Sequence, residues 1–298
     1  MKISLIVPYI DTWPITKRCI EKINENSDPD TEVILIDNGS AEHYDNRILD
    51  VLAKQNEQGG RLRNVRIHRN DDNTGVLATF KQGLELSTGD VICFIHNDVL
   101  IQEQGWDIKV SDVFASVHDL GLAGLFGAVG VGNNGGRIRS QSKMLGLEWG
   151  ACECHDVAWK HHSEYLDGLS PATILDGVGM FFSRKALTDL TYTDMFDDWR
   201  APHHFYDRTI PLKLIDRGYK IATIGIGFDH FSGQTANSST TYFDTGKKWL
   251  ESQSKYDPSK PVDQQIYNIA EEQFFSEFGN RLPATVDSNW NYSFQGVQ

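Results

Sequence analysis

The chain has 298 residues, enough for one large domain or two small ones, and its 40% hydrophobic and 23% charged content is ordinary for a soluble globular protein. No apolar run approaches the ~20 residues that a helix needs to cross a bilayer, and Pro8 and Asp11 interrupt the amino-terminal run, which therefore predicts a strand rather than a secretion signal. The net charge of −13 disfavours a nucleic-acid partner without excluding one.

The four cysteines are too few to form a disulfide framework in a chain of this length. A reducing, intracellular environment is the simplest interpretation, so we expect a cytoplasmic protein. Cys152, Cys154 and His155 stand close together in the sequence, but a structural zinc site needs four ligands. We therefore expect no zinc site at these residues.

The first hundred residues alternate between apolar runs and helical spacing. Continuous apolar runs are typical of parallel strands buried on both faces, and apolar residues three and four apart predict helices. The predicted strands are 3–9, 32–37, 64–69 and 91–96, and the predicted helices are 14–26, 43–55 and 73–90. We expect Thr74 to cap the third helix and Gly89 to end it in a left-handed turn. This alternation predicts right-handed crossovers in a doubly wound α/β sheet.

The remainder of the chain is less regular. The expected order is a helix at 104–118, a short strand running into a flexible glycine-rich loop at 121–137, an irregular stretch over a cleft at 138–172, and a strand followed by a helix at 172–187. After these come a helix at 205–219 that Pro211 disturbs, a strand and a polar loop at 220–235, and helices at 241–255 and 262–278. The last twenty residues either pack back on the body or fray.

Polar residues stand where three of the predicted strands end, and doubly wound sheets bind ligands outside these carboxyl ends. The groups are Pro8-Tyr9, Asp37-Asn38 and His96-Asn97-Asp98. The last group lies between two apolar stretches, which indicates that it is held rigidly, and both a plain turn and a metal and phosphate site are open at this point. Hard oxygen ligands of this kind suit Mg²⁺ or Mn²⁺. Asp37 could accept hydrogen bonds from a base or a ribose, although Asp-Asn-Gly-Ser is also good turn chemistry.

Several segments, taken in order and with their spacing, resemble family 2 glycosyltransferases of the GT-A type. They are SLIVPYI, EVILIDNGS, NTGVLATFKQGLELSTGDVICFIHNDV, LDGVGMFFSRKAL, YDRTIPLKLIDRGYKI and GFDHFSG, and the resemblance extends over roughly residues 2–232. The resemblance implies a Rossmann-like, mostly parallel sheet with helices on both faces. Residues 1–100 would form the nucleotide-binding half and 101–232 the acceptor half. We expect 233–298 to form a C-terminal helical extension packed on the same domain.

The resemblance also implies an activity. Such an enzyme transfers a hexosyl or pentosyl group with inversion from a nucleotide-sugar donor to a hydroxyl acceptor, with Mn²⁺ or Mg²⁺ on the diphosphate. UDP is the first expectation for the nucleotide, with GDP and dTDP open, and a glycan is the first expectation for the acceptor. Two alternatives stay open, namely a phage-type enzyme that glycosylates hydroxymethylated DNA bases and a non-catalytic binder of nucleotide sugars.

Site residues follow from the same resemblance. Asp98 matches the last acid of the Asp-x-Asp motif and would reach the metal, and His230 would complete the metal shell. His96 replaces the first acid of that motif and could contact ribose or phosphate instead. Asp207 would be the general base, although Tyr206 stands where the family carries a Glu.

The remaining expected contacts fall on two sides of the site. The nucleotide side would comprise Pro8, Tyr9, Asp11, Asp37, Asn73, Gly75, His96 and Asn97, and the acceptor side Asp176, Gly177 and Trp199. Asp197 and Asp198 are rival candidates for the base. His203 and His204 are adjacent, and side chains of adjacent residues in an extended chain point in opposite directions, so we expect acceptor contacts there rather than a metal pair.

Overall fold

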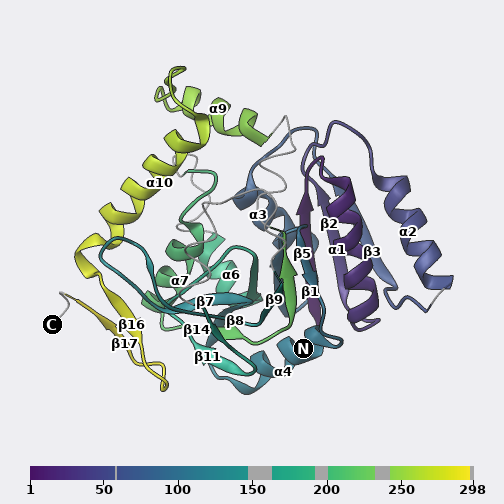
Figure 1. Ribbon diagram of the computed structural model, residues 1–298, viewed down its shortest axis with the longest axis horizontal. Helices are drawn as coiled ribbons and strands as arrows, with labels where there is room; N and C mark the ends of the chain where they lie inside the picture. The colour runs from purple at the N-terminus through teal and green to yellow at the C-terminus, as the bar shows by residue number, and fades with distance from the viewer. Residues whose placement is uncertain (58, 147–162, 192–200, 232–241, 296–298) are drawn as a thin grey trace.

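The computed structural model describes residues 1–57, 59–146, 163–191, 201–231 and 242–295 (Figure 1). A central eight-stranded sheet has the strand order β11-β14-β6-β13-β4-β1-β2-β3. Within it, β13 runs antiparallel to both of its neighbours and β11 runs antiparallel to β14, while the other pairings are parallel. The mostly parallel α/β sheet expected from the sequence is therefore confirmed.

The amino-terminal part of the chain alternates between strands and helices as expected. Its elements are β1 (Ile3–Tyr9), α1 (Trp13–Asn26), β2 (Glu32–Asp37), α2 (Asp45–Glu57), β3 (Asn64–Arg69), α3 (Val76–Leu86) and β4 (Val91–Ile95). All residues of β2 and β4 are buried, whereas residues of β3 are partly exposed because β3 forms the edge of the sheet.

The expected ends of α3 are wrong. Its first turn is preceded by Gly75, and the Thr74 hydroxyl is hydrogen-bonded to the Asn38 side chain instead of capping the helix. The helix closes at Ser87 in extended backbone, so Gly89 does not form a left-handed cap. A Cβ at Gly89 would lie 2.7 Å from the backbone nitrogen of Ser4, which shows that this glycine serves close strand packing.

The rest of the central sheet comes from the second part of the chain. Its strands are β6 (Leu120–Gly124), β11 (Leu169–Pro171), β13 (Gly179–Ser183) and β14 (Lys220–Ile224). The helices between them are α4 (Trp106–Ser116), α6 (Arg184–Thr191) and α7 (Tyr206–Asp216). The helices expected at 104–118 and 205–219 are thus confirmed, with Pro211 inside α7.

Two apolar layers cover the sheet, one on each face. Leu5 and Val7 of β1 belong to a core shared with α1, α2 and α4, whereas Ile6 between them belongs to a core shared with α3, α6 and α7. Because successive side chains of a strand point to opposite faces, a strand covered on both sides is apolar at every position. Helices therefore lie on both faces of the sheet, as expected.

A second sheet corrects the expectation for the middle of the chain. It contains β7 (Phe126–Val131), β8 (Arg137–Ser142), β10 (Ser163–Tyr165), β12 (Ile174–Leu175), β16 (Ala284–Val286) and β17 (Tyr292–Phe294). The stretch 121–137 is thus mainly strand and not a flexible loop, and the described parts of 138–172 are not irregular. The glycines in this stretch allow neighbouring strands to approach closely and do not mark a loop. A Cβ at Gly127, for example, would lie 2.7 Å from the Ile174 carbonyl oxygen.

A small third sheet joins distant parts of the chain. In it, β15 (Phe228–His230) pairs with β5 (Val99–Ile101) on one side and with β9 (Met144–Gly146) on the other. The apolar stretch after Asp98 is therefore a strand of its own rather than part of a turn.

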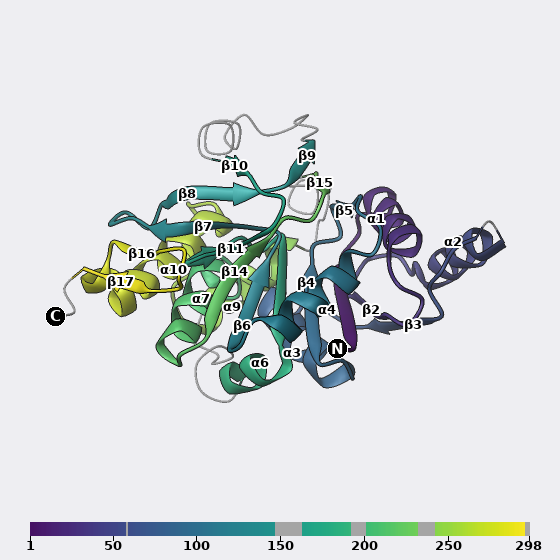
Figure 2. The ribbon, with the colours of Figure 1, turned by 90° about the horizontal axis from the view of Figure 1, so that it is seen from below.

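The carboxyl-terminal part returns to the body of the molecule (Figure 2). Helices α9 (Tyr242–Ser252) and α10 (Val262–Phe278) confirm the two expected helices, and a short 3₁₀ turn, η1 (Gly279–Arg281), follows. The chain then adds β16 to β7, and β17 to β16, so the last described residues pack back and do not fray. The division at residue 232 stays a prediction. None of the described helices is long and apolar enough to span a membrane.

Candidate active site

A cavity of about 460 Å³ opens at the carboxyl ends of β1, β2 and β4. It gathers most of the residues that the sequence assigned to a site. The lining residues among them are Pro8, Tyr9, Asn73, Gly75, His96, Asn97, Asp98, Asp176, Gly177, Asp207 and His230. Because the carboxyl ends of parallel strands meet at one edge, residues far apart in the sequence converge here.

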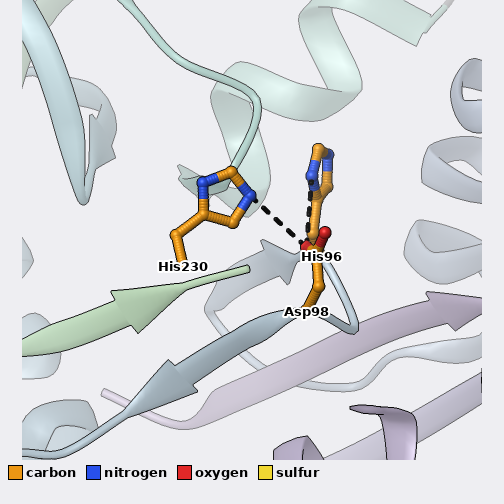
Figure 3. Close-up of side chains that lie close together, drawn as sticks. All are labelled: His96, Asp98 and His230. Carbon is orange, nitrogen blue, oxygen red and sulfur yellow. Dashed lines mark ion pairs between the residues drawn. The ribbon is translucent and has the colours of Figure 1, made fainter. Parts of the chain in front are cut away.

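Asp98 and two histidines lie together at the end of β4 (Figure 3). The turn between β4 and β5 carries His96 and Asp98, and the β5–β15 ladder places His230 opposite Val99. His230 Nε2 lies 3.4 Å from Asp98 Oδ1, and His96 Nδ1 lies 4.0 Å from the same oxygen. The backbone of Phe231 also donates a hydrogen bond to the Asp98 carbonyl oxygen, which fixes the pairing of the two segments.

The electrostatics of this cluster favour an ionised carboxylate. Burial raises the pKa of Asp98, but the nearby His230 and His96 outweigh burial and bring the pKa below its usual value. Burial lowers the pKa of His230, yet the Asp98 carboxylate reverses the effect and raises the pKa overall. Burial also lowers the pKa of His96, and there it prevails over the attraction of Asp98.

The cluster fits a divalent metal ion. Asp98 Oδ1 is buried and receives no well-aligned hydrogen bond from the described residues, although an acceptor oxygen removed from water normally has a donor. Carboxylate oxygen and imidazole nitrogen are ligands that Mn²⁺ accepts, and all three ligand atoms lie within 4.8 Å of one another. The assignment of Asp98 and His230 as metal ligands stays a prediction.

Asn97 anchors the turn that presents Asp98. Its amide nitrogen donates hydrogen bonds to the hydroxyls of Thr12 and Thr16, at 2.6 and 2.7 Å, at the start of α1. Asn97 borders the cavity, but this amide nitrogen is committed to the protein. Its assignment to the nucleotide stays a prediction.

Two residues expected on the nucleotide side do not line the cavity. Asp37 is fully buried, forms an ion pair with Arg69, and accepts a hydrogen bond of 2.9 Å from the Ser40 backbone. Asp11 accepts a hydrogen bond of 2.7 Å from the Ala41 backbone. Both carboxylates therefore shape the loop after β2 in this structure, and direct contact with a nucleoside stays a prediction.

Asp207 lies in the first turn of α7, as the sequence predicted for the base. Its Oδ2 is 3.1 Å from a guanidinium nitrogen of Arg137, and the same nitrogen is paired with Asp176. Burial raises the pKa of Asp176, but Arg137 outweighs burial and the pKa lies below its usual value. Arg137 thus holds the carboxylates of Asp176 and Asp207 together at this part of the cavity.

Tyr206 lies between the Asp207 side of the cavity and the Asp98 cluster. Its hydroxyl lies 3.4 Å from His96 Nε2, and its ring packs edge-on against Phe80 at 5.7 Å between centroids. A Cβ at Gly177 would lie 1.9 Å from the Tyr206 hydroxyl oxygen, so only glycine fits beside this tyrosine. Tyr206 is therefore a structural part of this cavity.

The expectation for His203 and His204 is wrong in its geometry. His204 and Phe205 have positive φ angles of 66° and 54°, so the chain is not extended at these residues. Both imidazoles instead face the Asp263 carboxylate of α10. Adjacent residues can meet in this way only because the backbone bends sharply between them.

Some residues of the site carried no signal in the sequence. Thr245 and Tyr267 line the cavity from α9 and α10, far along the chain. Arg137, at the end of the supposed glycine loop, pairs with the lining residues Asp176 and Asp207. No local pattern predicts such partners, because each one reaches the site through tertiary packing. The expected acceptor contact Trp199, the rival bases Asp197 and Asp198, and the group around Cys152 lie outside the described residues.

Known proteins resemble this chain in fold and in sequence pattern. The structure of the mannosyltransferase PcManGT from Pyrobaculum calidifontis superimposes with a TM-score of 0.51 at 13% identity, covering 93% of this chain and 71% of that one. The structure of residues 1–349 of TarS from S. aureus gives a TM-score of 0.49 at 13% identity, covering 93% and 72%. No curated protein sequence matches this chain.

A sequence model of the family described as glycosyl transferase family 2 matches residues 4–190, which is more than half of the chain. The match spans the strands and helices from β1 to β4, the β4–β5 turn with Asp98, and the segment that contains Asp176 and Gly177. It agrees with the resemblance inferred from the sequence motifs. The chain belongs to glycosyl transferase family 2.

Proposed function

We propose that this protein is an inverting glycosyltransferase that moves a hexosyl or pentosyl group from a nucleoside-diphosphate sugar, with UDP favoured, to a hydroxyl group of a glycan. One observation carries the proposal, namely that the Asp98–His230 cluster and the Asp207 carboxylate line one cavity. Its volume of about 460 Å³ lies in the range of small-molecule sites. The mannosyltransferase with this fold is in complex with GDP-Man and Mn²⁺, which supports a nucleotide sugar and a divalent ion here.

The proposed roles follow from position. Asp98 and His230 would hold Mn²⁺ or Mg²⁺, with His96 as a third candidate ligand. The ion, when bound, would neutralise the charge that develops on the leaving diphosphate. Asp207 would accept the proton of the acceptor hydroxyl while that oxygen bonds to the anomeric carbon and the bond to the diphosphate oxygen breaks. Arg137 would keep Asp207 in place for this transfer.

The test is a panel of UDP-, GDP- and dTDP-sugars, assayed for hydrolysis and for transfer with and without Mn²⁺. Oligosaccharides and hydroxymethylated DNA serve as alternative acceptors, and transfer to the DNA alone would replace the glycan in the proposal. We expect Asp207→Asn to lower kcat by about 10²- to 10⁴-fold while donor affinity is kept. Asp98→Asn should weaken Mn²⁺-dependent donor binding itself.

Two matched controls separate chemistry from stability. Asp216→Asn changes an acid of the same helix that pairs with Arg281, away from the cavity. Asp229→Asn changes the residue next to His230. The Asp229 carboxylate accepts a hydrogen bond of 2.8 Å from the Gln102 side chain. Both should transfer sugar at the wild-type rate. If Asp207→Asn transfers sugar at the wild-type rate, Asp207 is not the general base. If donor affinity is the same with and without Mn²⁺, the Asp98 cluster is not a metal site for the donor.

A further inference from the structure

A second group of potential metal ligands lies at another part of the cavity rim. His203 and His204 line the cavity, and Asp263 lies in the first turn of α10. His204 Nε2 is 2.8 Å from Asp263 Oδ1, and His203 Nε2 is 3.4 Å from the same oxygen. These residues share no atom with the Asp98 cluster, and the family model ends before them, at residue 190.

The spacing of the ligand atoms matches a metal site. With bonds of about 2.1 Å, ligand atoms are about 3.0 Å apart around an octahedral ion and about 3.4 Å apart around a tetrahedral one. The separations of 2.8 and 3.4 Å between the histidine nitrogens and Asp263 Oδ1 are close to these values, and all three ligand atoms lie within 4.8 Å of one another. Two imidazoles and one carboxylate form a ligand set typical of Zn²⁺ and Fe²⁺.

The backbone is bent in a way that creates this arrangement. His204 and Phe205 both have positive φ angles, which non-glycine residues rarely adopt. The bend turns both imidazoles toward one carboxylate oxygen. The ring of His204 also packs against Tyr267 at 5.5 Å between centroids, which fixes its direction.

The imidazole side of this group faces the cavity, because His203 and His204 both line it.

We propose that His203, His204 and Asp263 bind a second divalent transition-metal ion, for which Zn²⁺ is the best-matched probe. The ion ties the segment before α7 to helix α10. Asp207, in the first turn of α7, lies only three residues after His204, so the ion would also restrain the start of this helix. The site is independent of sugar transfer and would hold its ion in a protein with no nucleotide sugar bound.

Zinc stoichiometry tests the site, because the two clusters can be removed one at a time. Full-length protein is stripped with a chelator, reloaded with Zn²⁺, and analysed by isothermal titration and elemental analysis. We expect two equivalents in the wild type, one in Asp98→Asn, one in His204→Asn, and none in the double variant. Asparagine tolerates the left-handed conformation at position 204, so this substitution leaves the backbone unstrained.

Further measurements guard against unfolding and nonspecific binding. Asp263→Asn in the Asp98→Asn background should weaken zinc binding by about 100-fold or more. This loss is larger than expected for a residue that only hydrogen-bonds to a metal ligand, which costs about 10- to 100-fold. His118→Asn, which removes a histidine paired with Asp119 at an exposed position, should change nothing. Zinc should also raise the unfolding temperature of Asp98→Asn but not of the double variant.

The result that would overturn the proposal is equally specific. If the Asp98→Asn variant is folded by circular dichroism and binds no zinc, the three residues form only a hydrogen-bonded cluster. The same conclusion follows if His204→Asn retains both equivalents. Retention of both by Asp98→Asn would instead count against Asp98 as a metal ligand in the proposed function, whose transfer step is tested separately with nucleotide sugars and Asp207→Asn.

Discussion

At the scale of single residues, three consecutive side chains of the β4–β5 turn point to three different partners. Asn97 donates inward to the start of α1, Asp98 faces His230, and His96 faces the Tyr206 hydroxyl. The polar triplet between two apolar strands is therefore neither a plain turn nor three equivalent ligands. One residue anchors the turn so that its neighbours can face the cavity.

Gly177 is the residue whose replacement should disturb this arrangement most locally. A Cβ there would overlap the Tyr206 hydroxyl, so Gly177→Ala must displace Tyr206 and its contact with His96. We expect kcat to fall by up to about 100-fold, because a shift of about 1 Å at a reacting site costs that much. Donor transfer rates and thermal unfolding would measure the effect.

The control for this substitution is another glycine with free space. A Cβ at Gly168 would meet no atom within 4 Å, so Gly168→Ala should keep wild-type activity and stability. If Gly177→Ala also keeps full activity, Tyr206 does not need its observed position. A loss of folding without a specific loss of kcat would place the role of Gly177 in packing alone.

The candidate site could be predicted from the sequence only in part. Asp98, His230 and Asp207 stood in recognisable segments, and the structure brings Asp98 and His230 within 3.4 Å. Arg137 and Asp263 could not be predicted, since each meets its partner through folding of distant segments. The functional assignments of all these residues stay predictions until the variants are assayed.

At the scale of elements, long apolar runs were reliable and short or glycine-rich strands were not. β2 and β4 were evident because burial on both faces makes every position apolar. β5 has only three residues and exists because β15 pairs with it, and β7 contains glycines where neighbouring backbones approach closely. Local patterns do not carry this information, because the partner strand creates it.

Glu32 ties three strands together at the end of the sheet opposite the cavity. It is buried, and its carboxylate accepts hydrogen bonds from the Ser4 hydroxyl of β1 and from the Thr88 backbone just before β4. Burial raises the pKa of Glu32, but these hydrogen bonds and Arg66 outweigh burial and bring the pKa below 4.5. The ionised carboxylate therefore stabilises the fold.

We expect Glu32→Gln to lower the free energy of unfolding by about 2 kcal/mol at pH 7, because hydrogen bonds to a charged acceptor are lost. The folded pKa is depressed, so the contribution is present above pH 4.5 and disappears as the pH falls through the lower folded pKa. Urea denaturation at several pH values should show the two proteins converging in acid. A constant difference at every pH would contradict the ionic contribution, and donor affinity should not change.

At the scale of the whole molecule, the end of the chain completes sheets that begin much earlier. β16 pairs with β7, and two side chains of the last described segment hold Ile221 of β14 in the central sheet. The Ile221 backbone nitrogen donates to the Tyr292 hydroxyl at 2.8 Å, and Trp290 Nε1 donates to the Ile221 carbonyl oxygen at 3.1 Å. The sequence left packing or fraying open here, because an isolated short hairpin carries no sign of its partner.

This arrangement predicts that the carboxyl-terminal residues unfold together with the central sheet. Tyr292→Ala removes a half-buried ring and the partner of a backbone nitrogen, so we expect a loss of about 2 kcal/mol in the free energy of unfolding. Ser293→Ala, the exposed neighbour in the same strand, should stay within about 0.5 kcal/mol of the wild type. Urea unfolding followed by circular dichroism and by tryptophan fluorescence should give one shared midpoint that shifts only in Tyr292→Ala. Two separate midpoints in the wild type, or an unchanged midpoint in Tyr292→Ala, would mean that residues after 232 fold as a unit of their own.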